Sequence, residues 1–177
     1  MKDLAWKLIA RFLSQPAVAD WLIERAQRTP YSDIVKTIDG VPLRYMQRWW
    51  LFNAYPGQPG GPTKARWYSD LLPAARIHRI WLPDIDQHPH DHPWAARTIP
   101  LRNWYREQRA GEDHTRLVKP GMSAKLELGT YHQIVDLPAD GVWTLFITWK
   151  YQGTWGFLVN NRKVPWRKYL GLDKGNK

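Results

Sequence analysis

The first thirty residues place apolar side chains at helical spacing. Leu4, Leu8 and Phe12 recur every four residues, which predicts a helix over residues 3–13 with these three side chains on one face. A second helix is predicted over residues 16–28, because a Thr-Pro pair follows its last periodic position. The chain is therefore expected to start with helices.

From residue 31 onward the pattern changes to short strands separated by turn residues. Predicted strands cover residues 34–38, 43–52, 75–82, 94–101, 103–109, 114–119, 123–128, 132–137, 142–150 and 154–159. Asp39-Gly40 is a hairpin-type pair between the first two strands. Regular short strands predict an all-β sandwich or barrel. We interpret residues 1–30 as an N-terminal helical extension and residues 31–177 as one β domain.

Composition excludes several classes of site. The 177 residues contain no cysteine, so a disulfide framework, a thiolate zinc site and a cysteine nucleophile are excluded. The sequence contains no run of about 18 apolar residues, so it predicts no membrane span. The N-terminus lacks the apolar core and cleavage site of a signal peptide, so we expect a cytoplasmic protein.

Charge and tryptophan content leave a question about partners. The net charge is +10, and several of the 12 tryptophans stand beside arginine or lysine. Such a surface can bind nucleic acid, because cations contact phosphates and indoles stack on bases. We favour the alternative that the charges form a solvated surface and the indoles fill a β core.

The histidines carry the strongest chemical signal. His90 and His92 are two apart, so in a strand both imidazoles point the same way. His132 follows about forty residues later and can complete a three-histidine site from a neighbouring strand. Neutral imidazole suits iron, zinc, copper and nickel, and three protein ligands leave open positions. His88 has the same parity and stays an open alternative, although Pro89 interrupts regular pairing beside it.

The spacing around these histidines resembles the two motifs of the cupin superfamily over residues 75–160. The first motif is His-x-His, then Glu, then Gly; His90 and His92 fit it, with Ala96 at the Glu position and Asn103 at the Gly position. The second motif is Gly, five residues, Pro-x-Gly, two residues, His, three residues, Asn. Matching positions in this chain are Gly121, Glu127-Leu128-Gly129, His132 and Asp136.

A narrower pattern is similar to an uncharacterised group of small cupins from bacteria and phages. It comprises His-Asp-His-Pro-Trp at 90–94, Leu-Arg-x-x-Tyr-x-Glu at 101–107, Tyr-His at 131–132, Trp-Thr-Leu at 143–145 and Trp-Gly-Phe at 155–157. The resemblance implies a cupin jelly-roll barrel holding a divalent metal on His90, His92 and His132. With Ala96 in place of the carboxylate ligand, it implies a three-histidine site like that of cysteine-dioxygenase-like cupins, with Fe²⁺ favoured and Zn²⁺, Mn²⁺ or Ni²⁺ as alternatives.

Two further residues are candidates for catalysis. Tyr105 and Glu107 are two apart on one strand, so Glu107 is a candidate general base and Tyr105 a hydrogen-bond donor if that face points inward. The alternative is a half-exposed pair in which the carboxylate balances a nearby arginine. Arg97 and Arg102 could bind an anionic substrate, but nothing in the sequence fixes their direction. His78 and His114 are expected to be surface or satisfied packing residues.

These observations lead to two functional hypotheses. The first is a metal-dependent cupin enzyme, an oxygenase or isomerase acting on a small polar molecule. The second is a non-enzymatic binding or regulatory protein whose basic, tryptophan-rich surface contacts nucleic acid or a protein. An open pocket over the histidines would favour the enzyme. Cupins commonly dimerise, so a homodimer is a further expectation.

Overall fold

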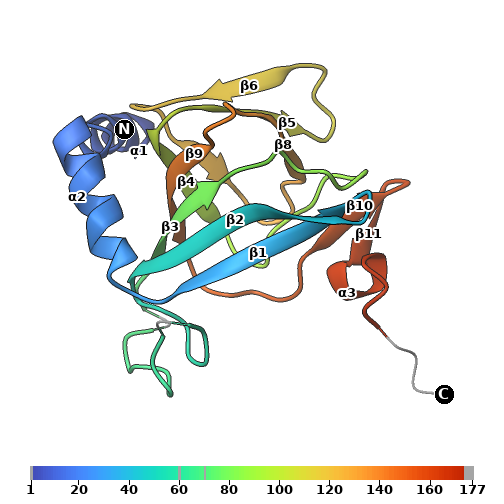
Figure 1. The fold of residues 1–177 in the computed structure, drawn as a ribbon, viewed down its shortest axis with the longest axis horizontal. Helices are drawn as coiled ribbons and strands as arrows, with labels where there is room; N and C mark the ends of the chain where they lie inside the picture. The colour runs from blue at the N-terminus through green and yellow to red at the C-terminus, as the bar shows by residue number, and fades with distance from the viewer. Residues whose placement is uncertain (1, 60, 70, 174–177) are drawn as a thin grey trace.

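The computed structural model describes residues 2–59, 61–69 and 71–173 (Figure 1). Two helices come first, α1 (Lys2–Leu13) and α2 (Pro16–Gln27). The strands are β1 (Tyr31–Ile38), β2 (Val41–Phe52), β3 (Ala74–Ile80), β4 (Ala96–Arg102), β5 (Tyr105–Arg109), β6 (Thr115–Val118), β7 (Ala124–Leu126), β8 (His132–Asp136), β9 (Val142–Thr148), β10 (Gly156–Val159) and β11 (Arg162–Pro165). A short helix, α3 (Trp166–Tyr169), follows the last strand. The sequence pattern predicted each strand except β11, and it did not predict α3.

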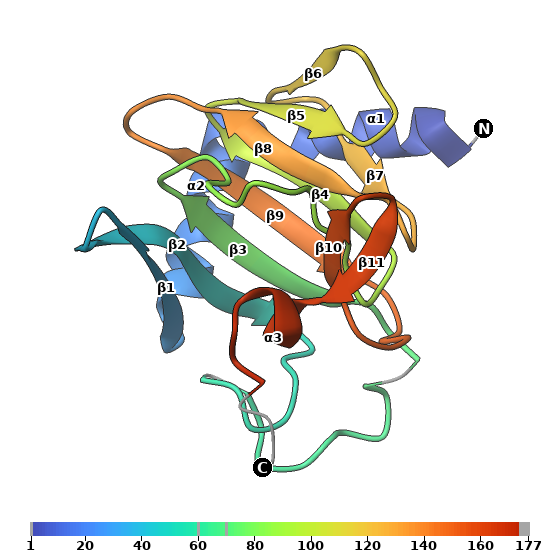
Figure 2. The same ribbon diagram turned by 90° about the vertical axis from the view of Figure 1, so that its right-hand side faces the viewer.

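The walls of the β domain are two antiparallel sheets. One sheet has six strands in the order β1-β2-β3-β9-β4-β7, and the other has three in the order β6-β5-β8. The β10–β11 hairpin forms a further two-stranded unit. The helices and this hairpin lie on opposite sides of the large sheet (Figure 2). The predicted turn at Asp39-Gly40 joins β1 to β2, and both residues have positive φ.

Successive side chains along the strands of the large sheet point to opposite faces, and both faces are buried. The outer face packs on the helices through Trp49, Ile77, Ile99, Trp143 and Leu145. Trp49 and Trp143 stack there, with ring centroids 5.5 Å apart. Each large side chain buried in this way stabilises the fold by about 1.5–3 kcal/mol. The inner face carries Arg48, Arg76, His78, Thr98, Thr144 and Phe146, which line a cavity.

Small side chains lie on the buried faces of the helices. Leu4, Leu8 and Phe12 are between 57% and 63% exposed, whereas Ala10 is fully buried. In α2 the buried residues are Ala19, Leu22, Ile23 and Ala26. Leu4, Leu8 and Phe12 share one face of α1, as predicted, and that face is exposed, while buried alanines let the helices pack closely. Of the helices in the described residues, none is long and apolar enough to cross a membrane.

Candidate metal centre

The backbone brings the two histidine segments together. His90 and His132 form an antiparallel bridge in which the N–H of each donates to the carbonyl of the other, at 3.1 and 2.9 Å. His90 also bridges Phe157 in β10. His92 lies two residues further along, so its ring shares the face of His90. The predicted neighbouring-strand arrangement is therefore observed.

The three imidazoles converge on one point. A ring nitrogen from each of His90, His92 and His132 lies within 4.8 Å of the other two, the only such group of potential metal ligands in the described residues. The Nε2 atoms of His92 and His132 are 2.9 Å apart. Two nitrogens bound 2.0–2.1 Å from one ion at a right angle would be separated by about 2.9 Å. This donor set fits a divalent ion.

Burial keeps two of the three rings neutral. Desolvation lowers the pKa of His90 to about 4, although nearby Asp84 opposes the shift. Burial, followed by the neighbouring His132 and His90, lowers the pKa of His92 well below its ordinary value. Neutral imidazole offers a lone pair where an imidazolium does not, so these rings are ready to bind a cation at neutral pH.

Glu107 lies behind His132. Its Oε1 is 3.0 Å from Nδ1 of His132, and its Oε2 is 3.2 Å from Nη2 of Arg109. The carboxylate is only 1% exposed. Burial alone would raise the pKa of Glu107, but contacts with His132 and Arg109 outweigh it and lower that pKa. A carboxylate on Nδ1 fixes the ring so that Nε2 presents its lone pair.

A second carboxylate, not selected from the sequence, lies near His90. Asp84 accepts hydrogen bonds from the Tyr45 hydroxyl and from the backbone N–H of Ile134. Burial would raise the pKa of Asp84, but His90 and these hydrogen bonds lower it overall. The site therefore has a carboxylate beside two of its histidines. Only the fold reveals this, because Asp84 stands in a turn without strand periodicity.

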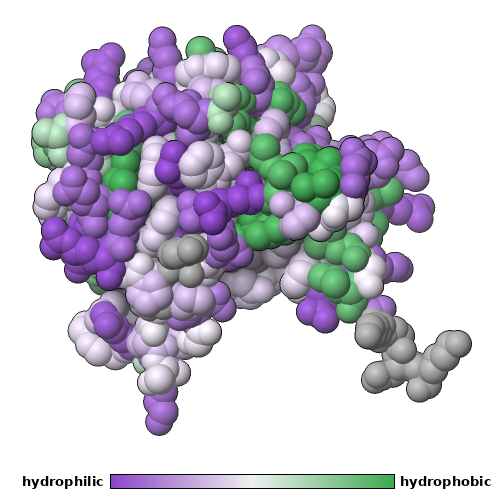
Figure 3. Space-filling model, in the orientation of Figure 1, coloured by the Kyte–Doolittle hydropathy of each residue, from purple (hydrophilic) through white to green (hydrophobic). Residues whose placement is uncertain are grey.

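The histidines line a cavity of about 620 Å³ between the two sheets. Apolar walls come from Met46, Ile80, Leu126, Ile134, Phe146 and Phe157. Trp155, Trp166 and Leu170, from the C-terminal hairpin and the residues after it, line the cavity as well, and apolar surface gathers around α3 (Figure 3). Trp155 and Trp166 stack with centroids 5.4 Å apart. The cavity is large enough for a small organic molecule.

The structure places Tyr105 and Glu107 differently relative to the cavity. Tyr105 is buried and lines the cavity, and its hydroxyl is hydrogen-bonded to the Thr98 side chain. Burial and nearby Glu107 raise the pKa of Tyr105, so the hydroxyl stays protonated. Glu107 is not a lining residue and contacts the site through His132.

Several charged side chains occupy positions that the sequence did not settle. Arg97 lies over the Trp6 ring, and Arg102 pairs with Asp20, so both face the helices. Sequence reasoning missed the arginines of the cavity, which are Arg48 and Arg76. The expectation for His78 was wrong, because it lines the cavity and its buried Nε2 has no hydrogen-bond partner. His114 is exposed and pairs with Asp113, as expected for a surface residue.

The residues flanking the ligands hold the C-terminal hairpin. Asp91, which points away from the histidines, accepts hydrogen bonds from Gly156 N at 2.7 Å and Lys163 Nζ at 2.6 Å. His88 is outside the metal-ligand group, and its Nδ1 lies 3.0 Å from the Tyr169 hydroxyl. The segment that carries two candidate ligands is therefore also an anchor for the hairpin.

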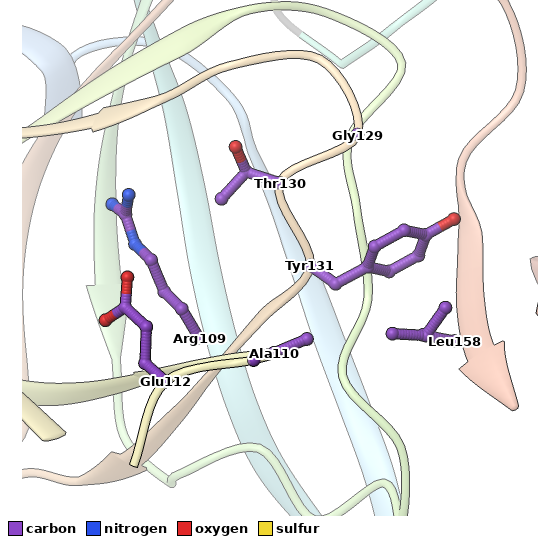
Figure 4. Close-up of a pocket in the computed structure, with 8 residues that line it drawn as sticks. Arg109, Ala110, Glu112, Gly129, Thr130, Tyr131 and Leu158 are labelled. Atoms are coloured by element: carbon purple, nitrogen blue, oxygen red, sulfur yellow. The ribbon is translucent and has the colours of Figure 1, made fainter. Parts of the chain in front are cut away.

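A second, more open hollow of about 480 Å³ lies outside the barrel (Figure 4). Arg109, Glu112, Thr130 and Tyr131 line it, and the Tyr131 ring extends toward Leu158. Its lining contains no histidine. Tyr131 therefore points away from the metal-ligand group.

Comparison with known proteins identifies the fold. No protein-family model matches the chain, and no curated protein matches its sequence. The structure is similar to DMSP lyase DddQ from Ruegeria pomeroyi DSS-3, with a TM-score of 0.51 and 19% identity over 85% of this chain and 68% of that one. It is also similar to Rru_A2000 from Rhodospirillum rubrum, a cupin-2 domain, with a TM-score of 0.50 and 14% identity over 81% of this chain and 83% of that one. The chain has the cupin fold, with a helical N-terminal extension, as its motifs predicted.

Proposed function

We propose that this chain is a metal-dependent cupin enzyme that holds one divalent ion on His90, His92 and His132 and acts on a small polar molecule. The convergence of three imidazoles in a 620 Å³ cavity carries the proposal. A bound ion would supply Lewis acidity and open coordination positions for substrate. The pocket over the histidines favours an enzyme over a binding module, which would need no such space.

The donor set suits several divalent ions, because neutral imidazole binds iron, zinc, copper and nickel. We propose Fe²⁺, with Zn²⁺, Mn²⁺ or Ni²⁺ as alternatives, and an oxygenase or isomerase reaction.

The protein residues around the ligands have distinct proposed roles. Glu107 orients His132 and raises the basicity of its Nε2, so we propose it as a positioning residue. Tyr105 lines the cavity with a hydroxyl that stays protonated, so it can donate a hydrogen bond to substrate. Asp84 stabilises positive charge that develops near His90.

Metal analysis of purified protein tests the proposal. We expect one equivalent of a divalent ion in the wild type and in His88→Ala, a control whose imidazole contacts Tyr169 instead. His132→Ala should lose the ion while keeping a folded circular-dichroism spectrum. The proposal fails if the wild type binds no stoichiometric metal after reconstitution with each candidate ion, or if His132→Ala retains it.

A further inference from the structure

A buried arginine without a counter-ion lies in the cavity wall. Arg76 is 5% exposed, and its guanidinium lies 4.9 Å from the Trp50 ring centroid and 5.0 Å from that of Trp94. Tyr55 and Phe146 also face it, each at 5.5 Å. Its Nε and Nη2 have no hydrogen-bond partner, and no carboxylate of the described residues pairs with it. The guanidinium therefore has aromatic contacts and no anionic ones.

This arrangement is costly unless something completes it. An uncompensated buried charge costs several kcal/mol, and each unsatisfied buried donor costs about 1–3 kcal/mol. Cation–π contacts return about 2 kcal/mol when desolvated. Burial lowers the pKa of Arg76 to about 10, which leaves it charged at neutral pH. The fold keeps a planar cation with free donors in a cavity, where an oxyanion can pair with two of them.

Two neighbouring side chains, one cationic and one neutral, extend the polar surface around Arg76. His78 follows Arg76 on the same face of β3, and its buried Nε2 also lacks a partner. In the strand register His78 lies between two partners, Arg48 of β2 on one side and Thr144 of β9 on the other. All four residues line the cavity. Burial, Arg76 and Arg48 lower the pKa of His78, so a neutral ring remains available as a hydrogen-bond partner.

Aromatic rings connect the wall formed by Arg76 and His78 to the metal-ligand group. The Phe146 ring contacts both His78 and His92, with centroid distances of 5.0 and 5.7 Å. Trp94 lies over Arg76 and stacks beside His92 at 6.2 Å. One aromatic ring therefore lies between this wall and the histidines, and both groups line the same cavity, so one bound molecule can contact both.

We infer that the substrate carries an oxyanion, as a carboxylate, phosphonate or sulfonate, which Arg76 binds together with Arg48 and His78. The inference rests on the proposed function for the reacting end of the molecule. The anion-binding wall itself requires no metal. Arg76 supplies paired N–H donors, and the flanking rings exclude water and accept the aliphatic part of the ligand.

Calorimetric titration of the metal-free protein tests the inference with butyrate, propylphosphonate and 1-propanesulfonate as probes. Butyramide, which matches butyrate in shape without its charge, is the control ligand. We expect at least one anion to saturate a single site at least tenfold more tightly than butyramide. Arg76→Gln should weaken the binding of that anion at least tenfold. Arg79→Gln should not, because Arg79 lies on the same strand, 3.6 Å from the Trp81 ring and outside the cavity.

The outcomes separate this inference from the proposed function. If no anion binds more tightly than butyramide, or if Arg76→Gln binds it unchanged, the inference is overturned even when the histidines hold metal. If anion binding persists in His132→Ala while metal binding fails in the wild type, the anion site stands and the proposed enzyme does not. Should Arg76→Gln fail to fold, Arg76→Lys keeps the charge and loses the planar fork, and it should still weaken binding.

Discussion

Glu107→Gln is the substitution that most directly probes how the protein tunes its metal site. The change keeps the shape of the side chain and removes its charge from contacts of 3.0 Å with His132 and 3.2 Å with Arg109. Because Glu107 is only 1% exposed, water cannot replace the lost carboxylate as a partner for His132 and Arg109. Removing one charge from a buried ion pair costs about 3–5 kcal/mol, because the remaining charge is left unpaired.

Part of this energy appears in metal affinity, because the carboxylate increases the basicity of the ligand nitrogen. Substitution of such outer partners weakens metal binding 10–100-fold, or about 1.4–2.7 kcal/mol. We expect that loss in a competitive titration with a chromophoric chelator. Glu127→Gln is the matched control, because Glu127 is exposed and pairs with the exposed Lys125. If Glu107→Gln folds and binds metal within threefold of the wild type, the positioning role is refuted.

Two further predictions concern stability. The pKa of His90 is about 4 in the folded protein and about 6.5 in the unfolded chain, so the unfolded chain binds a proton first as the pH falls. The stability of the metal-free protein should therefore fall by on the order of 3 kcal/mol between pH 6.5 and 4. Urea titrations across that range measure it, and an equally steep loss in His90→Gln would contradict the assignment. Asp91→Ala should destabilise the fold by about 1–3 kcal/mol, because Gly156 N–H and Lys163 lose their acceptor; urea midpoints equal to the wild type would show that the hairpin is held by other contacts.

The candidate ligands could be predicted because local rules fix them. His90 and His92 share a face through alternation, and the resemblance of the spacing from Gly121 to Asp136 to the second cupin motif implies that His132 lies beside them. Glu107 could be selected by its parity with Tyr105. Its contact with His132 depends on the pairing of β5 with β8, which the sequence alone does not specify.

The cavity arginine and histidine could not be assigned in the same way. Both faces of the large sheet are buried, one by the helices and one around the cavity, so apolar residues occur on both. Strand β3 accordingly has Ile77 on one face and Ile80 on the other, and Arg76 and His78 share the face of Ile80. When neither face is solvent, alternation no longer marks the inward side. The exposure of Leu4, Leu8 and Phe12 was open for a related reason, since helical spacing alone does not show which face of a helix packs on the sheet.

The pairing of His90 with Phe157 has a consequence for biosynthesis. The hydrogen bonds between the Pro89–Asp91 segment and the Gly156–Leu158 segment connect positions far apart in the chain. A ribosome releases His90 and His92 long before it releases the strand that orders them. The nascent chain therefore cannot complete the pairing of the segment that carries these two candidate ligands until the C-terminal hairpin has emerged and docked.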